Sequence, residues 1–367
     1  MKATLKSYKY ITLSAMLVAA TGAQAQQNAA NAVAYNYETN FKTTRVVTVG
    51  NDVNISISGN DNDAMIEKKK TFSKTYTIGK TDLVTLDNRF GELKINSWDK
   101  AELKVEITMS AKGGTDARAS EILDRLSIDE SKSSGGYSFR TEINSKNDRR
   151  GNNTYKDEGF SINYEVWMPS TARLDAYNEF GATFIGDFSG VTNIVTKFGA
   201  LTAGKLTNNK KVHVEFGSAT IEAINNGNVE IKFSKAIINN LDGTVKAEFE
   251  HCGGIQLNLN NNLKSLTVKN NFTQLNLNVN KELSAKYNIY TNFGEFRNKT
   301  SFDVANYDED DENHGPKFDK TYVGKSGNGT IDVKVKSEFS TITLGHELKM
   351  DLKEEKKEKK GKGSVNI

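Results

Sequence analysis

This chain of 367 residues has little cysteine and little proline, and its positive and negative charges nearly cancel. A single cysteine excludes a disulfide within the chain, so stability has to come from packing. With two prolines and 29 glycines, the turns must be built mainly on glycine and asparagine, a habit of β-rich proteins. The formal net charge is only +3, which gives the chain no overall electrostatic reason to bind nucleic acid.

The amino terminus has the three parts of an export signal. Lysines at positions 2, 6 and 9 precede an uncharged apolar stretch over 10–22, and Ala23-Gln24-Ala25 supplies a small-x-small cleavage site. The apolar stretch is shorter than the roughly 20 residues that a membrane-spanning helix needs. We therefore predict a cleaved signal peptide over 1–25 and a polar N-terminal extension over 26–65. The mature chain would be neutral, without a transmembrane span, and located in the periplasm, at the cell surface or outside the cell.

Apolar and polar residues alternate with period two along most of the chain from about residue 72. Clear examples are the stretches 103–109, 162–168 and 229–233. Such alternation is typical of strands with one buried face, so the sequence predicts an all-β fold.

One segment has helical spacing instead. Thr115 follows two glycines and can cap a short helix over about 115–126, in which Ala119, Ile122, Leu123 and Leu126 fall on one face. We expect this helix to pack against a sheet.

A phenylalanine followed by a small or polar residue returns after successive alternating stretches, at intervals of 16 to 23 residues between Phe180 and Phe293. Stacked coils bring equivalent residues together, so we expect these phenylalanines to form an inward-facing ladder. We therefore predict a parallel β-solenoid, with a β-sandwich as the alternative. The predicted repeat corners are Phe90, Gly91, Phe180, Gly181, Phe198, Gly199, Phe216, Gly217, Phe233, Phe249, Phe272, Phe293 and Gly294, and Phe339 resembles an outlying member.

Motifs that carry catalysis are incomplete in this sequence. His346-Glu347 begins like a zinc-protease helix, but Met350 stands where the second histidine is required. The chain has no Cys-x-x-Cys pair and no Gly-x-Ser-x-Gly elbow. We predict no catalytic residues and no cofactor, and we expect Cys252 to be a small buried apolar residue.

An acidic insertion interrupts the repeat over 306–328. Asp308, Asp310 and Glu312 alternate as calcium-loop ligands can, and Asp319 stands at the twelfth place. Asn313 occupies the place of the loop glycine, so a solvated acidic loop is the alternative to a calcium site. Residues 347–367, rich in Lys and Glu, are predicted to be a charged flexible tail.

The stretch 72–77 and the run 86–100, which contains Asn88-Arg89-Phe90-Gly91 and Trp98-Asp99-Lys100, resemble the opening of the putative adhesin family of Bacteroidetes-type, Gram-negative envelope proteins. The resemblance covers about residues 65–345. It implies an adhesin-like β-solenoid domain over 66–346 and transfers no catalytic residues to this chain.

Three functions remain open from the sequence. The first is an exported non-enzymatic repeat protein that binds an unknown protein or glycan at the cell envelope, or builds part of it, through an Asn- and Thr-rich face. The second is a polysaccharide-processing β-helix enzyme, which would need a cleft with clustered acids or bases. The third is a periplasmic signalling or scaffold protein that binds another protein.

Overall fold

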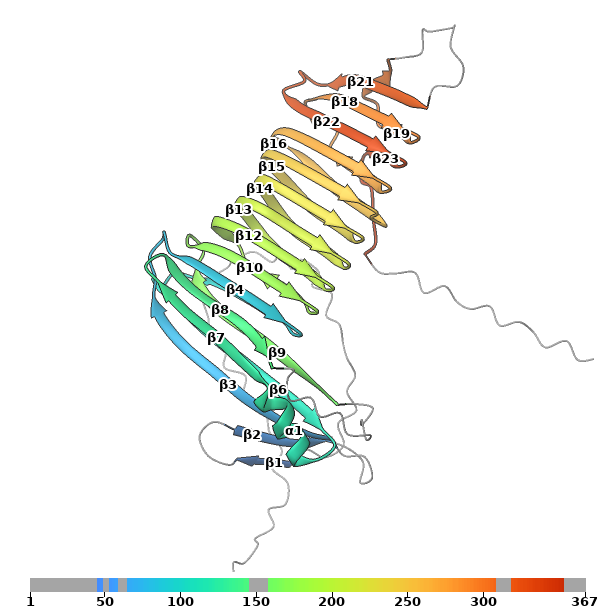
Figure 1. The fold of residues 1–367 in the computed structure, drawn as a ribbon. Helices are drawn as coiled ribbons and strands as arrows, with labels where there is room; N and C mark the ends of the chain where they lie inside the picture. The colour runs from blue at the N-terminus through green and yellow to red at the C-terminus, as the bar shows by residue number, and fades with distance from the viewer. Residues whose placement is uncertain (1–44, 49–52, 59–64, 145–157, 308–317, 353–367) are drawn as a thin grey trace, which may run out of the picture. The chain divides into compact units, whose positions relative to one another are not determined.

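The computed structural model describes residues 45–48, 53–58, 65–144, 158–307 and 318–352 (Figure 1). Contacts divide the chain into two units, Met1–Asn40 and Phe41–Ile367, and every described residue belongs to the second. The predicted signal peptide, most of the N-terminal extension and the tail beyond 352 therefore lie outside the described residues. Within the described residues the fold is all-β with one helix, as the sequence predicts.

An antiparallel group of strands forms the N-terminal part of this unit. The strands pair in the order β1–β2–β3–β6–β9, and β7 forms a hairpin with β8. In β6 the alternating residues Leu103, Val105 and Ile107 are completely buried, which gives this group its apolar face. The strand bounds are β1 Arg45–Thr48, β2 Val53–Ser58, β3 Met65–Thr77, β6 Glu102–Gly113, β7 Leu126–Ser133, β8 Gly136–Ile143 and β9 Gly159–Pro169.

The helix α1, Asp116–Asp124, begins where the sequence predicts. The Thr115 hydroxyl accepts a hydrogen bond from the backbone N–H of Arg118 at 3.1 Å, which satisfies one of the free donors at the helix start. Ala119, Ile122 and Leu123 are buried, so the apolar face packs inward as expected, whereas Leu126, predicted on the same face, is the first residue of β7.

Parallel pairing begins at β8 and β9 and joins most of the remaining strands into two rows, which appear as successive steps in Figure 1. Row one has the order β8–β4–β10–β12–β13–β14–β15–β16–β22–β18. Row two has the order β9–β5–β11–β13–β14–β15–β16–β17–β23–β19. Strands β13 to β16 contribute to both rows, because each begins in row two and ends in row one of the next turn.

The bounds of these strands follow. They are β4 Leu83–Arg89, β5 Leu93–Trp98, β10 Arg173–Glu179, β11 Thr183–Ile185, β12 Phe188–Lys197, β13 Ala200–Glu215, β14 Ser218–Lys232, β15 Lys235–Glu250, β16 Gly254–Asn271, β17 Gln274–Val279, β18 Ala285–Asn292, β19 Glu295–Lys299, β20 Asp303–Asn306, β21 Asp319–Ser326, β22 Ile331–Glu338 and β23 Thr341–Gly345.

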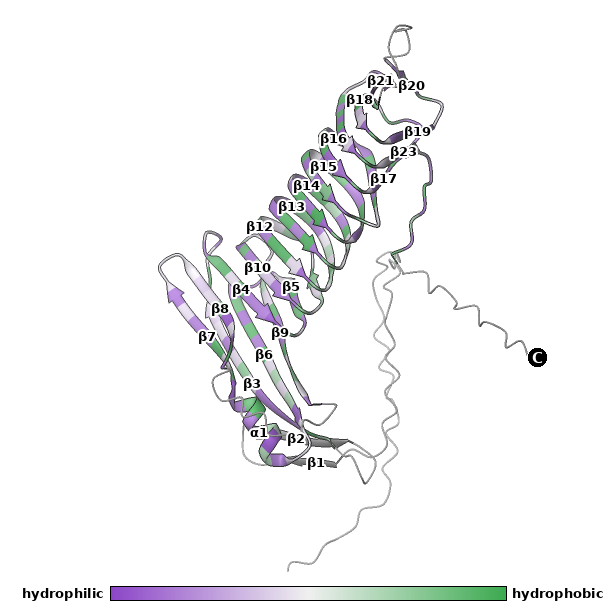
Figure 2. Ribbon diagram, turned by 45° about the vertical axis from the view of Figure 1, so that its right-hand side comes forward, coloured by the Kyte–Doolittle hydropathy of each residue, from purple (hydrophilic) through white to green (hydrophobic). Residues whose placement is uncertain are grey.

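Pairing is in register along the repeat, so residues at the same position in successive turns lie beside one another. Val212 pairs with Val229, and Ile231 pairs with Phe249. All four are at most 1% exposed, and they line the core between the two rows. The alternation of apolar and polar residues along each strand is visible in Figure 2.

Near the C-terminal end the spatial order of the turns departs from their order in the chain. After β17 the chain continues into β18, yet β18 does not pair with β16. Strand β22 lies between them and pairs with both, and β23 lies in the same way between β17 and β19. The antiparallel strands β21 and β20 follow β18 at this end.

Candidate interaction surface

Each turn passes from row one to row two through a corner with an unusual backbone. At eight phenylalanines φ lies between 47° and 60°, in the left-handed region that glycine and asparagine ordinarily occupy. The conformation costs a residue with a side chain about 1–2 kcal/mol. The next residue is glycine, serine, threonine or cysteine, and at the glycines the previous turn leaves no space for a side chain. A Cβ on Gly217, for example, would lie 1.8 Å from the carbonyl oxygen of Gly199.

The corner rings stack on one another outside the core. Consecutive ring centroids are 4.8–5.2 Å apart and the ring planes differ by 3–9°. The phenylalanines are 39–52% exposed, so the prediction of an inward-facing ladder is wrong. A left-handed corner turns the side chain away from the core. We call this stack the aromatic ridge; its members in spatial order are Phe90, Phe180, Phe198, Phe216, Phe233, His251, Phe272, Phe339 and Phe293.

One predicted corner is incorrect. Phe249 lies inside β15, completely buried, and the corner of that turn is His251, with φ of 53°. The His251 ring stacks between Phe233 and Phe272, at centroid distances of 5.2 and 4.8 Å. The interval from Phe233 to His251 is 18 residues, equal to that between earlier corners, so spacing alone could have identified the histidine. The other predicted corners, and Phe339, take part in these turns as expected.

Two shallow grooves follow the ridge on the side of row two. One has a volume of about 670 Å³ and lies beside the rings of Phe198, Phe216 and Phe233. The other, of about 540 Å³, lies beside Phe272 and Phe293, and the two share Gly253. Small residues that follow the corners, Gly199, Gly217 and Ser234, line the first groove.

The segment after β23 crosses the outer side of row two and reaches the first of these grooves. His346 Nδ1 lies 2.7 Å from the carbonyl oxygen of Val279, and the backbone N–H of Leu348 donates to Asn278 Oδ1 at 2.9 Å. Leu352 lines the groove beside Phe216. The predicted tail, 347–367, therefore begins with residues that contact the coils, and 353–367 lie outside the described residues. The apolar residues at 348, 350 and 352 alternate as in a strand, a signal that sequence reasoning missed.

The predicted Asn-rich face lies in row two, and its amides bond to their neighbours. Asn239 and Asn240 donate to Glu222, at 3.0 and 3.3 Å, and Asn278 donates to Asn258 at 3.1 Å. Thus several amides of this face are already bonded within the chain, and the C-terminal segment covers part of the face through Asn278.

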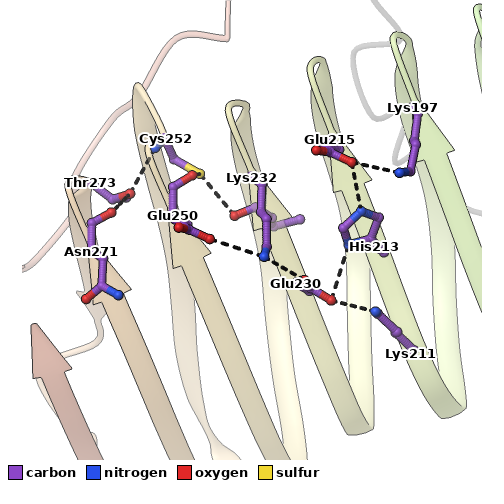
Figure 3. Close-up of polar contacts among 11 residues, drawn as sticks. Lys197, Lys211, His213, Glu215, Glu230, Lys232, Glu250, Cys252, Asn271 and Thr273 are labelled. Atoms are coloured by element: carbon purple, nitrogen blue, oxygen red, sulfur yellow. Dashed lines mark hydrogen bonds and ion pairs between the residues drawn. The ribbon is translucent and has the colours of Figure 1, made fainter.

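Row one carries a network of ion pairs on its outer side (Figure 3). Lys197 pairs with Glu215 at 2.9 Å, and Lys232 pairs with Glu250 at 3.1 Å. His213 lies between the carboxylates of Glu215 and Glu230, at 3.5 and 3.3 Å. Pairs that remain partly exposed to solvent, as these do, stabilise a fold by about 0–1 kcal/mol each. Their mutual pairing accounts for these charges without a catalytic role.

The network strongly favours the ionised form of the Glu230 carboxyl group, as its pKa shows. Burial opposes ionisation of the carboxyl, but hydrogen bonds from Lys211 and Lys232 outweigh it and lower the pKa to about 2. The pKa of Glu215 is also lowered, chiefly by its hydrogen bond with Lys197. Both groups are therefore anionic at neutral pH and unsuited to proton transfer there.

Cys252 is buried beside the ridge, as the sequence predicts, with 4% of its surface exposed. Its backbone N–H donates to Thr273 Oγ1 at 2.9 Å, and its thiol donates to the carbonyl oxygen of Ile231 at 3.2 Å. Burial raises the pKa of the thiol, so it stays protonated and unreactive.

Of the four calcium-ligand candidates, the structure describes only Asp319. Asp308, Asp310 and Glu312 lie outside the described residues, and Asp319 is the exposed first residue of β21. In the described part of the chain no three His, Cys, Asp or Glu side chains lie close enough to hold a metal ion. In that part, too, no helix has the length and apolar character required to cross a bilayer.

Comparison with known proteins gives structural likeness only. No protein-family model and no curated protein matches the sequence. The fold is similar to that of a putative adhesin from Bacteroides fragilis NCTC 9343, at 11% identity and a TM-score of 0.41, covering 75% of this chain and 97% of that one. It is also similar to a putative lipid binding protein from Parabacteroides distasonis ATCC 8503, at 11% identity and a TM-score of 0.30, covering 75% and 96% of the two chains.

A third similar structure is a putative adhesin from Parabacteroides merdae ATCC 43184, at 10% identity and a TM-score of 0.25, covering 75% of this chain and 96% of that one. The names of the adhesins match the family that the sequence resembles, and the names of all three proteins are those of adhesins or binding proteins, not enzymes. At these identities and TM-scores the likeness carries no information about a ligand.

Proposed function

We propose that the chain is an exported, non-enzymatic binding protein of the cell envelope, in which residues 66–346 form a parallel β-solenoid with an acidic insertion at 306–328. The parallel, in-register pairing of successive turns supports a solenoid over a sandwich, whose sheets are antiparallel. Export rests on the signal peptide predicted from the sequence. The partner is a protein or glycan of the envelope.

The observation that carries this proposal is the aromatic ridge with its two grooves. Glycine or asparagine would form the same corners without backbone strain, yet the chain places phenylalanine there and leaves each ring 39–52% exposed. Stacking returns about 0.5–1.5 kcal/mol for each pair of rings, which only roughly offsets the strain. A row of exposed aromatic side chains beside open grooves is typical of a surface that contacts a partner.

The stacking also restricts how a partner can bind. Because neighbouring rings cover one another's faces, only ring edges are exposed along the middle of the ridge. Ring edges carry the positive part of the aromatic quadrupole, so they suit oxygen-rich groups such as peptide carbonyls and glycan hydroxyls. At the two ends of the ridge Phe160 packs edge-on against Phe90 and Phe318 stacks on Phe293, so the outer faces of the end rings are also covered.

The first test is the location of the domain on cells that express it. Protease digestion and antibody labelling are compared between intact cells and cells with a permeabilised outer membrane. Labelling of intact cells is expected for a surface binding protein. Protection until permeabilisation would instead place the chain in the periplasm, and retention in the cytoplasm would contradict the export on which the proposal depends.

The second test is removal of ridge rings. In the double variant Phe216→Asn and Phe233→Asn, asparagine tolerates the left-handed corner, so the fold is kept while two rings are lost. Binding of the purified chain to envelope preparations is expected to fall at least tenfold. The matched control is Phe184→Thr, which removes an exposed phenylalanine of β11 outside the ridge. Equal binding by both variants would contradict a binding role for the ridge.

A further inference from the structure

A separate concavity lies at the C-terminal end of row one, away from the ridge. Strands β18, β20, β21 and β22 form it, and its volume is about 1040 Å³. Three lysines, Lys286, Lys325 and Lys334, line it together with Asp303 and Asp332. Tyr307, which is 73% exposed, stands at its edge. The size is that of a small-ligand site.

Strand register places like charges directly opposite each other in this concavity. Lys286 on β18 pairs in register with Lys325 on β21, and the same row continues to Asp332 on β22 and to Asp303 on β20. Like charges that face each other across paired strands destabilise a sheet. The acids stand on the outer sides of the two lysines, so none separates them.

These lysines differ from the basic residues in the middle of row one. Lys197, Lys211 and Lys232 each pair with a glutamate of a neighbouring turn. In the concavity, no ion pair or hydrogen bond joins the side-chain ammonium group of any of the three lysines to a described residue. The fold therefore gathers three cations here, and although Asp332 and Asp303 stand opposite Lys286 and Lys325 in register, no ion pair joins them.

We propose that this concavity binds an acidic saccharide. Its carboxylate is held between Lys286 and Lys325, with Lys334 beside it, while Asp303 and Asp332 accept hydrogen bonds from the sugar hydroxyls and Tyr307 offers a ring face to the sugar. The two aspartates decide the ligand class. They repel a bare inorganic anion, but they suit a molecule that carries both a negative charge and hydroxyl donors. The assignment rests on the proposed binding function and names one of its ligands.

A rival counterion lies in the chain itself. The acidic run Asp308-Glu309-Asp310-Asp311-Glu312 follows Tyr307 directly in the sequence. The test therefore includes a second chain, in which these five acids are replaced with Asn and Gln. If the run competes for the lysines, this chain binds the saccharide more tightly than the natural one.

The experiment is calorimetric titration of the purified mature chain with trigalacturonate, a trimer of an acidic sugar, at low and moderate salt. We expect binding that weakens as salt rises, and at least a tenfold loss in the double variant Lys286→Gln and Lys325→Gln. The matched control is Lys246→Gln, an exposed lysine of β15 outside the concavity. The neutral trimer of galactose should bind at least tenfold more weakly than trigalacturonate.

Several results would overturn the assignment. One is that trigalacturonate binds neither the natural chain nor the chain without the acidic run. The others are that the double lysine variant binds it with unchanged affinity, or that the neutral trimer binds equally well. Equal binding of inorganic phosphate or of an oligoglutamate peptide would contradict the saccharide class. Because the titration uses purified protein, failure here leaves the cell-surface and ridge tests unaffected, and their failure leaves this result standing.

Discussion

The central turns and the flanking turns fill the same inward position in opposite ways. This position lies two residues before each corner, and its occupants are at most 2% exposed throughout. In the centre it holds the apolar residues Val214, Ile231 and Phe249. On either side it holds polar residues, which are Asn88, Asn178 and Thr196 toward the N-terminus and Asn270, Ser337 and Thr291 toward the C-terminus.

The three asparagines among these polar residues bind the backbone of the corners. Asn178 Nδ2 donates to the carbonyl oxygens of Ala182 and Gly91, at 3.0 and 3.2 Å. Asn270 Nδ2 donates to the Thr273 carbonyl oxygen at 3.1 Å and to Ser337 Oγ at 3.0 Å. The corner geometry is therefore compatible with two kinds of support, hydrophobic burial in the centre and hydrogen bonds in the flanking turns. Exchanging one for the other tests whether each turn depends on its own kind.

The largest effect is expected from placing a polar residue in the centre. In Ile231→Asn a buried isoleucine would be lost, and the new amide would lie between the apolar side chains of Val214 and Phe249, so that only corner backbone could pair with it. We expect a loss of about 4 kcal/mol in the free energy of unfolding, measured by urea denaturation. The control Ile231→Val should lose only about 1 kcal/mol. Similar losses in both variants would mean that the central position does not require apolar burial.

Contact between turns gives the next largest effect. In Gly217→Ala the added Cβ would meet the carbonyl oxygen of Gly199 at 1.8 Å, so the two turns must separate. We expect a loss of about 3 kcal/mol, seen as a lower midpoint of thermal or urea unfolding. Gly159→Ala, at the start of β9 in the antiparallel part, is the control because no atom lies within 4 Å of its added Cβ. A comparable loss there would contradict the view that the turns, rather than glycine itself, set the cost.

The reverse exchange, Asn178→Val, should cost less. It removes the donor to two corner carbonyls and the acceptor of the Asn88 amide, which donates to Asn178 Oδ1 at 3.1 Å. We expect a loss of about 2 kcal/mol from these unsatisfied groups, partly compensated by the apolar replacement. Asn276→Val, on the outer side of β17, should change the free energy of unfolding by less than about 0.5 kcal/mol. A stabilised Asn178→Val variant would show that the flanking turns do not need their polar residues.

The sequence predicts the local features of both regions and misses the features that depend on distant pairing. Period-two alternation identifies the strands, and Thr115 identifies the helix start, because both signals are carried by neighbouring residues. The sequence predicts Phe249 as the corner because the other corners hold phenylalanine. In this turn Phe249 fills the inward position, and His251 forms the corner. The outward direction of the rings was missed because it depends on a left-handed φ that phenylalanine rarely adopts.

The position of β22 between β16 and β18 could not be predicted at all. Leu266 pairs with Val333, 67 residues later, and no local pattern specifies such a partner. The concavity with Lys286 and Lys325 depends on the same rearrangement, since it forms where β18, β21 and β22 meet. Candidate sites at this end of the chain thus became visible only from the pairing of strands.

The smallest effect concerns the ion pairs on the outer side of the central turns, whose stabilisation is present at neutral pH and is lost in acid. The pKa of Glu230 is lowered to about 2 in the folded chain, so its contribution is complete above the ordinary carboxyl pKa of about 4.5 and is lost as pH falls from there toward 2. Screening by solvent limits this contribution to about 1 kcal/mol. Urea unfolding at pH 7 and pH 3 should therefore show a smaller acid-induced loss in the free energy of unfolding for Glu230→Gln than for the natural chain.

The control is Glu282→Gln, which changes an exposed turn residue without an ion pair among the described residues. It should leave the acid-induced loss unchanged. An identical pH dependence in all three chains would mean that the network does not hold the charge of Glu230 in the folded state.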